Sequence, residues 1–254
     1  MKKMKNYNAI IFLSLFLIFW EVAVRLLKVK QFILPAPTKI AMALWSYKKV
    51  LFTVHFPVTL AEVMAGLLIS VILSVLISVL MLKSKKLEEG IYPFLVISQT
   101  IPIIVLSPVI IMWFGYGLSG KIAITVLITF FPIVVNTFEG FKSIDIKYLN
   151  LLKTMGATES QIFWKVRVPA CLPNFFIGLK VGAAVSVIGA VIGEWLGGNS
   201  GLGVFSRRMS SNLEADAVFA AVIILALLGI FLFGVVKILE KIFIPWSLNT
   251  KKEG

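Results

Sequence analysis

Long apolar runs constrain this chain more than any other feature. Hydrophobic residues make up 59% of its 254 residues and charged residues 15%, whereas a soluble domain carries about 25% charged residues. A helix of about 20 apolar residues, rising ~1.5 Å per residue, crosses a ~30 Å hydrocarbon core. The sequence therefore predicts an all-α, polytopic membrane protein with a single transmembrane domain over residues 1–254. We expect six spans, at 9–24, 60–82, 91–114, 122–138, 177–196 and 217–236.

The rare residue types and the net charge exclude several classes of function. One cysteine, Cys171, and one histidine, His55, leave no intrachain disulfide and no basis for a protein metal site. The net charge of +13 does not indicate nucleic acid, because the basic residues flank the apolar runs as topology signals do. Gly115–Ile122 nearly spells a phosphate-binding P-loop, but Ile122 stands where a hydroxyl must bind Mg²⁺. We therefore expect no catalytic residue and no metal in this chain, which is not an enzyme.

The distribution of Lys and Arg predicts the orientation in the cytoplasmic membrane. These residues are more numerous in the segments that share a side with the N-terminus, so both termini are expected to be cytoplasmic. No convincing cleavage site follows the first run, which we expect to be retained. With this orientation the polar segment 145–173 is cytoplasmic, and a helix over 38–50 lies on the outer surface.

The segment 145–173 begins with the pattern of a short, capped helix. Asp145 is a suitable N-cap for a helix through Met155, and Gly156 stands where a left-handed C-cap would end it. Apolar and polar residues fall on different sides of this helix. An amphipathic loop that rests on the membrane has the same pattern as one that docks a soluble partner.

A second short helix follows in the same segment. Thr158 and Gln161 have the spacing of a capping box, and Pro169 and Pro173 are expected to stop the helix and turn the chain toward the next span. The predicted structure is a pair of short helices between two long spans.

Polar residues inside two spans are candidates for a translocation path. In the third span, Gln99 and Thr100 lie among prolines that free backbone carbonyl groups, and such backbone is tolerated only against protein or a wet cavity. Glu194 ends the fifth span. Each of these residues has an alternative role. Gln99 and Thr100 would form hydrogen bonds with the backbone groups that the broken helix leaves free, and Glu194 would be a solvated acid at the membrane surface.

The fifth span also carries a ridge of small residues, which lets helices approach closely. We expect this ridge to pack at the interface between two copies of the chain. Its residues are Gly178, Gly182, Ser186 and Ala190, with Gly189, Gly193 and Gly197 beside them.

The segment 145–173 resembles the EAA loop of binding-protein-dependent ABC importer permeases. Gly156 matches the glycine of that motif, and Val166, Val168 and Pro169 match its Ile-x-Leu-Pro end at the right spacing. Residues 150–152 read Asn-Leu-Leu in place of Glu-Ala-Ala, so any role of the family's glutamate does not carry over. Six spans with this loop between the fourth and fifth also resemble the type I importer fold.

The resemblance implies partners and docking residues. Two cytoplasmic ABC ATPase subunits, which bind ATP-Mg, would dock on this coupling loop. An extracytoplasmic solute-binding protein would deliver the solute, and a second permease copy would complete a homodimer. The chain itself would hold no cofactor and bind no nucleic acid. The coupling residues would be Leu152, Met155, Gly156, Ala157, Phe163 and Pro169.

The segment 192–219 resembles the nitrate/sulfonate/taurine branch of these permeases. Its Gly-Glu-Trp-Leu-Gly run at 193–197 is similar to permeases for the hydroxymethylpyrimidine precursor of thiamine. Sulfonate, taurine or nitrate stays open as an alternative substrate. An ion-coupled secondary transporter would show paired repeats with matched broken helices, and a membrane assembly factor would need no docking loop. Association with a nucleotide-binding subunit discriminates between these classes.

Overall fold

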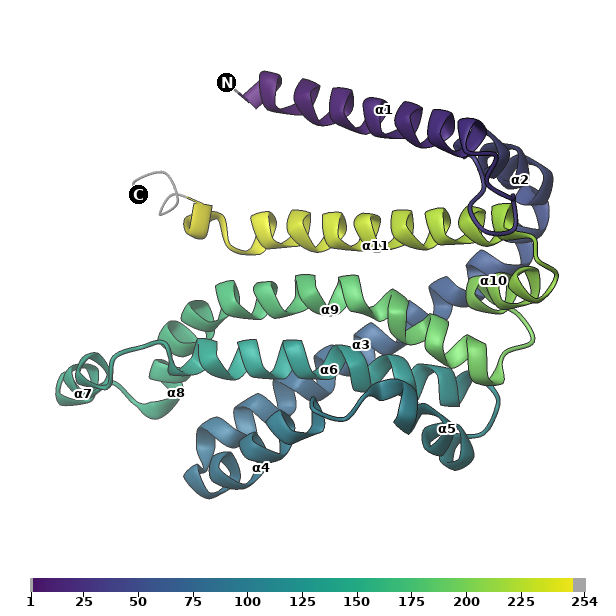
Figure 1. Cartoon of the computed structure of the whole chain (residues 1–254). Helices are drawn as coiled ribbons and strands as arrows, with labels where there is room; N and C mark the ends of the chain where they lie inside the picture. Colours follow the sequence, from purple (N-terminus) through teal and green to yellow (C-terminus); the bar gives the residue numbers. More distant parts are fainter. Residues whose placement is uncertain (1, 249–254) are drawn as a thin grey trace. The chain divides into compact units, whose positions relative to one another are not determined.

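The computed structural model describes residues 2–248, and the side chains of residues 11–246. Within that range the chain forms helices joined by turns, without a strand (Figure 1), which confirms the all-α class. The elements are α1 (Lys2–Leu26), α2 (Pro37–Val50), the π turn η1 (Leu51–His55), α3 (Phe56–Lys83), α4 (Lys85–Ser98), α5 (Ile103–Phe114), α6 (Leu118–Lys142), α7 (Ile146–Thr154), α8 (Glu159–Ile162), the π turn η2 (Phe163–Arg167), α9 (Val168–Gly197), α10 (Leu202–Ser211), α11 (Ala215–Phe243) and a 3₁₀ turn, η3 (Pro245–Leu248).

The chain divides into two compact units, each with its own packing. Unit 1 comprises the described residues of 1–58 and 199–226, and unit 2 those of 59–198 and 227–254. Helices α3 and α11 contribute residues to both units. Two compact units can belong to one membrane domain, so the single domain expected over residues 1–254 stays a prediction.

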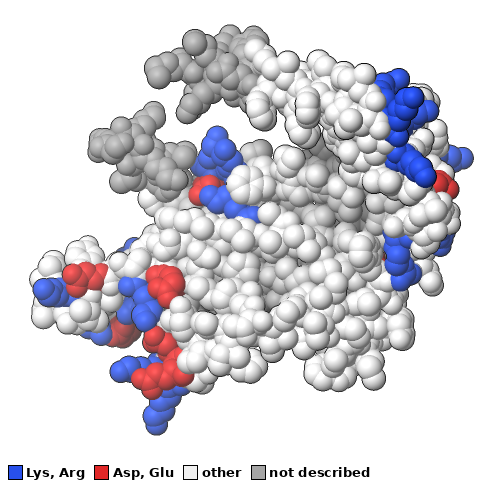
Figure 2. All heavy atoms as spheres, in the orientation of Figure 1, with Lys and Arg blue, Asp and Glu red and all other residues white. Residues whose placement is uncertain are grey.

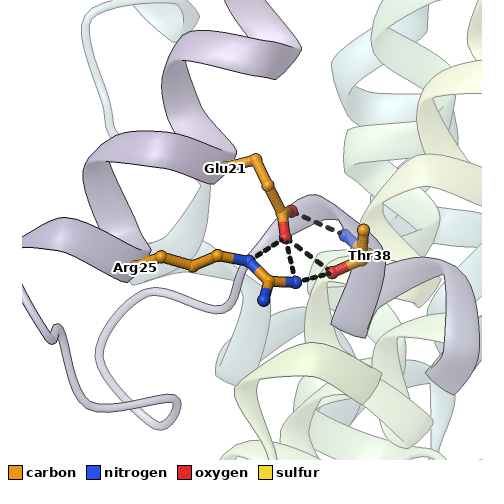
Figure 3. Close-up of polar contacts among 3 residues, drawn as sticks. All are labelled: Glu21, Arg25 and Thr38. Atoms are coloured by element: carbon orange, nitrogen blue, oxygen red, sulfur yellow. Dashed lines mark hydrogen bonds and ion pairs between the residues drawn. The ribbon is translucent and has the colours of Figure 1, made fainter.

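In unit 1, a carboxylate from α1 holds the N-terminus of α2 (Figure 3). Glu21 accepts the backbone N–H of Thr38 at 3.0 Å, the Thr38 hydroxyl at 2.8 Å and the Arg25 Nε at 2.6 Å. The first N–H groups of a helix have no partner within the helix, and a negative charge beside them is favourable. Glu21 therefore ties the end of α1 to the start of α2, the helix that was expected at 38–50.

The core of unit 1 forms where α10 packs on η1 and α11. Leu51, Leu202 and Phe205 are buried there. His55 lies beside Phe205, and its Nδ1 accepts the backbone N–H of Gly201 at 3.1 Å. The single histidine thus holds the turn that starts α10, which is a structural role.

Helix α9 lies along α6 in unit 2, at very short range (Figure 1). A Cβ atom added to any of four α9 glycines would come closer than 3.0 Å to an atom of α6. The prediction that these glycines pack against a second copy of the chain is therefore wrong, because α6 of the same chain already packs against them. Small residues indicate a close helical neighbour but do not identify it. The four glycines are Gly178, Gly182, Gly189 and Gly193.

A row of hydroxyl groups joins α3 to the same helix. Three fully buried serines of α3, spaced by four residues, donate hydrogen bonds of 3.0–3.1 Å to carbonyl oxygens of α6. Each serine is small enough to let the backbones approach and polar enough to bond across them. The donors are Ser70, Ser74 and Ser78, and the acceptors are Val126, Phe130 and Val134.

Four continuous helical segments in the described part are long and apolar enough to cross a bilayer: Pro37–Lys83, Leu118–Lys142, Glu159–Gly197 and Ala215–Phe243. The third expected span, 91–114, is instead two helices, α4 and α5, bent by 109° at a short break. Counted as one broken span, this pair raises the number to five. The first expected span begins among residues whose side chains lie outside the described part, so the count of six stays a prediction.

We predict that Gly178→Ala destabilises unit 2, because the added methyl group would lie 2.5 Å from the carbonyl oxygen of Pro132. Overpacking of this kind costs about 1–3 kcal/mol of unfolding free energy. Gly234→Ala is the matched control, since an added Cβ in that part of α11 meets no atom within 4 Å. Thermal unfolding of the solubilised protein should show a lower midpoint for Gly178→Ala alone. Equal midpoints would contradict the close packing of α9 on α6.

Candidate functional site

The segment 145–173 begins with α7, at the end of unit 2 where α6 ends. Asp145 is the N-cap of this helix and accepts the backbone N–H of Lys147 at 2.8 Å, as predicted. In Figure 2, Lys, Arg, Asp and Glu side chains gather over α7, α8 and the start of α4, whereas the surface over the middle of α6 and α9 is mostly uncharged. This end of the unit therefore has the polarity of a surface outside the hydrocarbon core.

Helix α7 ends on a left-handed glycine, which confirms the predicted C-cap. Gly156 has φ +87°, its N–H donates to the Lys153 carbonyl at 3.0 Å, and the Ala157 N–H donates to the Leu152 carbonyl at 3.0 Å. This pair of bonds is the Schellman arrangement, which satisfies carbonyl groups at the helix end.

A capping box fixes the second helix at the other side of the turn. The backbone N–H of Gln161 donates to the Thr158 hydroxyl at 3.3 Å, and the Thr158 N–H donates to Gln161 Oε1 at 2.8 Å. The prediction of a capping box is confirmed. The turn between α7 and α8 is thus held by local hydrogen bonds on both sides.

The prediction that Pro169 and Pro173 stop the second helix is wrong. Helix α8 continues through the π turn η2 into α9, so the helical segment runs without interruption from Glu159 to Gly197. Pro169 lies in the first turn of α9, where its missing N–H is tolerated because the wider π turn precedes it. The second helix of the segment is therefore the first part of a long span and not a separate element.

The exposed surface of α7 is mixed, with Lys147, Asn150 and Lys153 exposed beside large apolar side chains. Met155 is 75% exposed and Leu151 54% exposed, whereas Leu149 on the opposite face is buried. Sequence reasoning missed Leu151, although its spacing of four from Met155 was an available signal. The other residues predicted to couple differ in exposure, with Gly156 exposed and Leu152, Ala157, Phe163 and Pro169 partly buried.

The two polar residues predicted in the third span lie at the break between α4 and α5. Gln99 is the C-cap of α4 and is exposed. Thr100 is also exposed, and its hydroxyl donates to the Ile97 carbonyl at 2.8 Å. Their place in a translocation path stays a prediction, but both lie at the 109° bend between α4 and α5.

Glu194 lies in a buried polar cluster at the opposite end of α9 from α8. It accepts the Thr59 hydroxyl at 2.6 Å, and Glu62, which interacts with it, accepts a hydrogen bond from Lys121 Nζ at 2.7 Å. Glu62 and Glu194 are fully buried, and Lys121 is 6% exposed. Side chains of α3, α6 and α9 thus bring two carboxyl groups and one ammonium together out of water.

This Glu62–Lys121–Glu194 cluster joins three helices at one point. Buried charges are expensive unless they are paired, and charged groups inside membrane spans are rare and commonly functional. Among its charged residues, only Glu194 was a sequence candidate. Glu62 lies within the expected span 60–82 and Lys121 directly before the span 122–138, so a charge at each position was the available signal. That the two side chains lie close together depends on tertiary packing. A contact of Glu194 with solute stays a prediction.

We predict that Lys121→Met destabilises the protein more than the double variant Glu62→Gln/Lys121→Met. Removing the lysine alone takes away the ammonium group to which the buried Glu62 is bonded, at a cost of about 3–5 kcal/mol. The double variant removes one carboxyl group as well and should recover much of the loss. The unfolding midpoints of both variants in detergent measure this, and a double variant that is no more stable than the single one would contradict it.

Comparison with known proteins gives the chain's relatives. Residues 66–243 match the family described as binding-protein-dependent transport system inner membrane component. The chain is 44% identical over 245 residues to the formylaminopyrimidine transport permease protein ThiX of Halalkalibacterium halodurans, covering 95% of this chain and 98% of the relative. It is 36% identical to the riboflavin transport system permease protein RibX of Chloroflexus aurantiacus, over 93% and 89% of the two chains. The putative aliphatic sulfonates permease SsuC of Bacillus subtilis is 27% identical, over 89% and 83%.

The chain belongs to the family of binding-protein-dependent transport system inner membrane components. It is therefore the permease subunit of an ABC importer, a multi-pass membrane protein whose relatives are transport subunits and not enzymes. Membership of this family includes partnership with an ATPase and with a solute-binding protein. The resemblance drawn from the segment 145–173 is confirmed.

Proposed function

We propose that this permease imports a pyrimidine of the thiamine-precursor class, with amino and formyl substituents as in the name of its 44% identical relative. Two observations favour this class over a sulfonate. The sulfonate permease SsuC of Bacillus subtilis is only 27% identical, and the Gly-Glu-Trp-Leu-Gly run at 193–197 resembles that of permeases for a thiamine pyrimidine precursor. Formylaminopyrimidine is therefore the first solute to test.

The proposed orientation places α7, α8 and both termini in the cytoplasm. The segments at the α7 end of unit 2 carry many Lys and Arg residues, while 99–121 and 194–198, at the other ends of the helices, contain only the buried Lys121. An excess of Lys and Arg marks the cytoplasmic side of membrane proteins. The outer surface would then receive the binding protein.

The proposed coupling element is α7 with the turn at Gly156, docked on a cytoplasmic ATPase subunit that binds ATP with Mg²⁺. The observation that carries this proposal is the exposed pair Leu151 and Met155 on a helix capped at both ends. A capped element keeps its shape when a partner moves it. Two permease copies, each with its ATPase, would form the working homodimer.

The continuous helix from α8 through η2 to α9 is the proposed lever. A displacement of α8 at the docking site would move α9 as well, because no break lies between them, and α9 is packed tightly on α6. Closure of the ATPases on ATP would therefore change the packing of the spans. Coupling requires that these contacts differ in energy between the inward-open and outward-open states.

We predict that Gly156→Val weakens binding of the ATPase subunit by about tenfold. A Cβ at this position meets no atom within 4 Å, so the whole effect comes from φ +87°, where a side chain costs about 1–2 kcal/mol. Gly90→Val is the matched control, because an added Cβ there also meets open space and φ is ordinary. Gly156→Asn should be milder, since Asn tolerates this conformation.

The measurement is a titration of the ATPase against each variant in vesicles, with insertion checked by protease protection. Equal binding by Gly156→Val and Gly90→Val would contradict the docking role of this turn.

The substrate is tested by uptake into vesicles that contain this permease, its own ATPase and ATP, with its own binding protein outside. We expect ATP-dependent accumulation of labelled formylaminopyrimidine and background accumulation of taurine, an alkanesulfonate and riboflavin. Uptake of a sulfonate instead would keep the importer mechanism and overturn the substrate. Omission of the ATPase is the control for leakage.

A further inference from the structure

A groove of about 850 Å³ lies in unit 2 between α3 and the segment from α8 to α9. We call it the α3–α9 groove. Its walls are mainly apolar, and they include Val75 and Val79 of α3, Trp164 of η2, and Leu172 and Phe175 of α9. Trp164 is 65% exposed. The groove adjoins the proposed docking region, because Phe163 and residues of α8 also line it, whereas Leu151 and Met155 do not.

Two cations and one acid complete the lining of the groove. The acid, Glu159, already forms an ion pair of 2.6 Å with Lys153. The cations, Lys83 and Arg167, form no hydrogen bond or ion pair with other described side chains. Arg167 also interacts electrostatically with Glu159, so this lining of two cations and one acid carries a net positive charge beside apolar walls.

The two kinds of lining residue are ordered along the helices. Lys83 is the last residue of α3, and Arg167 directly precedes α9. Val79 and Val75 lie one and two turns further into the same long apolar span as Lys83. The cations are thus at the boundary of the hydrocarbon core, where Trp, Lys and Arg are favoured, and the apolar walls extend into it.

We propose that the α3–α9 groove binds an anionic phospholipid of the surrounding bilayer. Its phosphate lies between Lys83 and Arg167, and an acyl chain lies against Val75, Val79 and Phe175. A free phosphate would leave the apolar walls exposed to water, and a zwitterionic lipid would leave the charge of the groove uncompensated. The acidic lipid matches both features at once.

The test uses the intact permease–ATPase complex in vesicles and the fluorescence of Trp164. Brominated phosphatidylglycerol or brominated phosphatidylcholine is added to the bilayer, and the difference between the native protein and Trp164→Phe isolates the quenching of this one tryptophan. Each cation near a membrane surface favours an acidic lipid by about fivefold, so we expect phosphatidylglycerol to be preferred by about 30-fold.

Two variants separate charge from shape. Lys83→Gln/Arg167→Gln should reduce the preference to near equality, while the matched control Lys86→Gln/Lys241→Gln, which neutralises two exposed lysines of unit 2 outside the groove, should retain it. Val79→Phe fills the apolar part and should reduce quenching by both lipids.

Equal quenching by the two lipids in the native protein would overturn the proposal, as would a preference unchanged in Lys83→Gln/Arg167→Gln. No quenching by either lipid would show that a second copy or another protein covers the groove, and would also overturn it. ATP-driven uptake measured in the same vesicles reports separately on the proposed transport function.

Discussion

The close approach of α9 to α6 is the contact on which the rest of unit 2 depends. Four glycines, together with other small residues, keep one face of α9 so small that an added Cβ atom at any of the four would come closer than 3.0 Å to an atom of α6. On α3, three serines let that helix approach the same α6 and bond to its carbonyl groups. In a bilayer, where apolar contact alone does not drive helices together, such close packing and hydrogen bonding provide the specificity.

Because of this packing, a movement of the segment 145–173 at the end of α6 would be transmitted to the spans. The segment 145–173 is capped at Asp145, Gly156 and Thr158, and then continues as helix into α9. A force applied to α8 therefore reaches α9 directly, and α9 cannot slide freely because its glycines are fitted to α6. The family's partnership with an ATPase requires an element of this kind, which is rigid locally and continuous with a span.

The far end of the same helix carries a group of buried charged side chains. Glu62, Lys121 and Glu194 come from three helices and are removed from water together. Their interaction is stable only while the three helices keep their positions, because each charge depends on the others. The long helix thus connects a polar end, which is the proposed docking end, with an end where charged side chains are buried together.

The sequence by itself determined the all-α membrane class, the caps of α7 and α8, and the family, because apolar length and capping depend on residues within a few positions of one another. The left-handed Gly156 and the Thr158–Gln161 box are such local features. Only the tertiary structure decided that the glycine ridge faces α6, that the helix continues through Pro169, and that Glu62 and Lys121 meet beside Glu194. Lys121 follows Glu62 by 59 residues, and a one-dimensional pattern shows that a small or charged residue needs a neighbour without showing which distant segment supplies it.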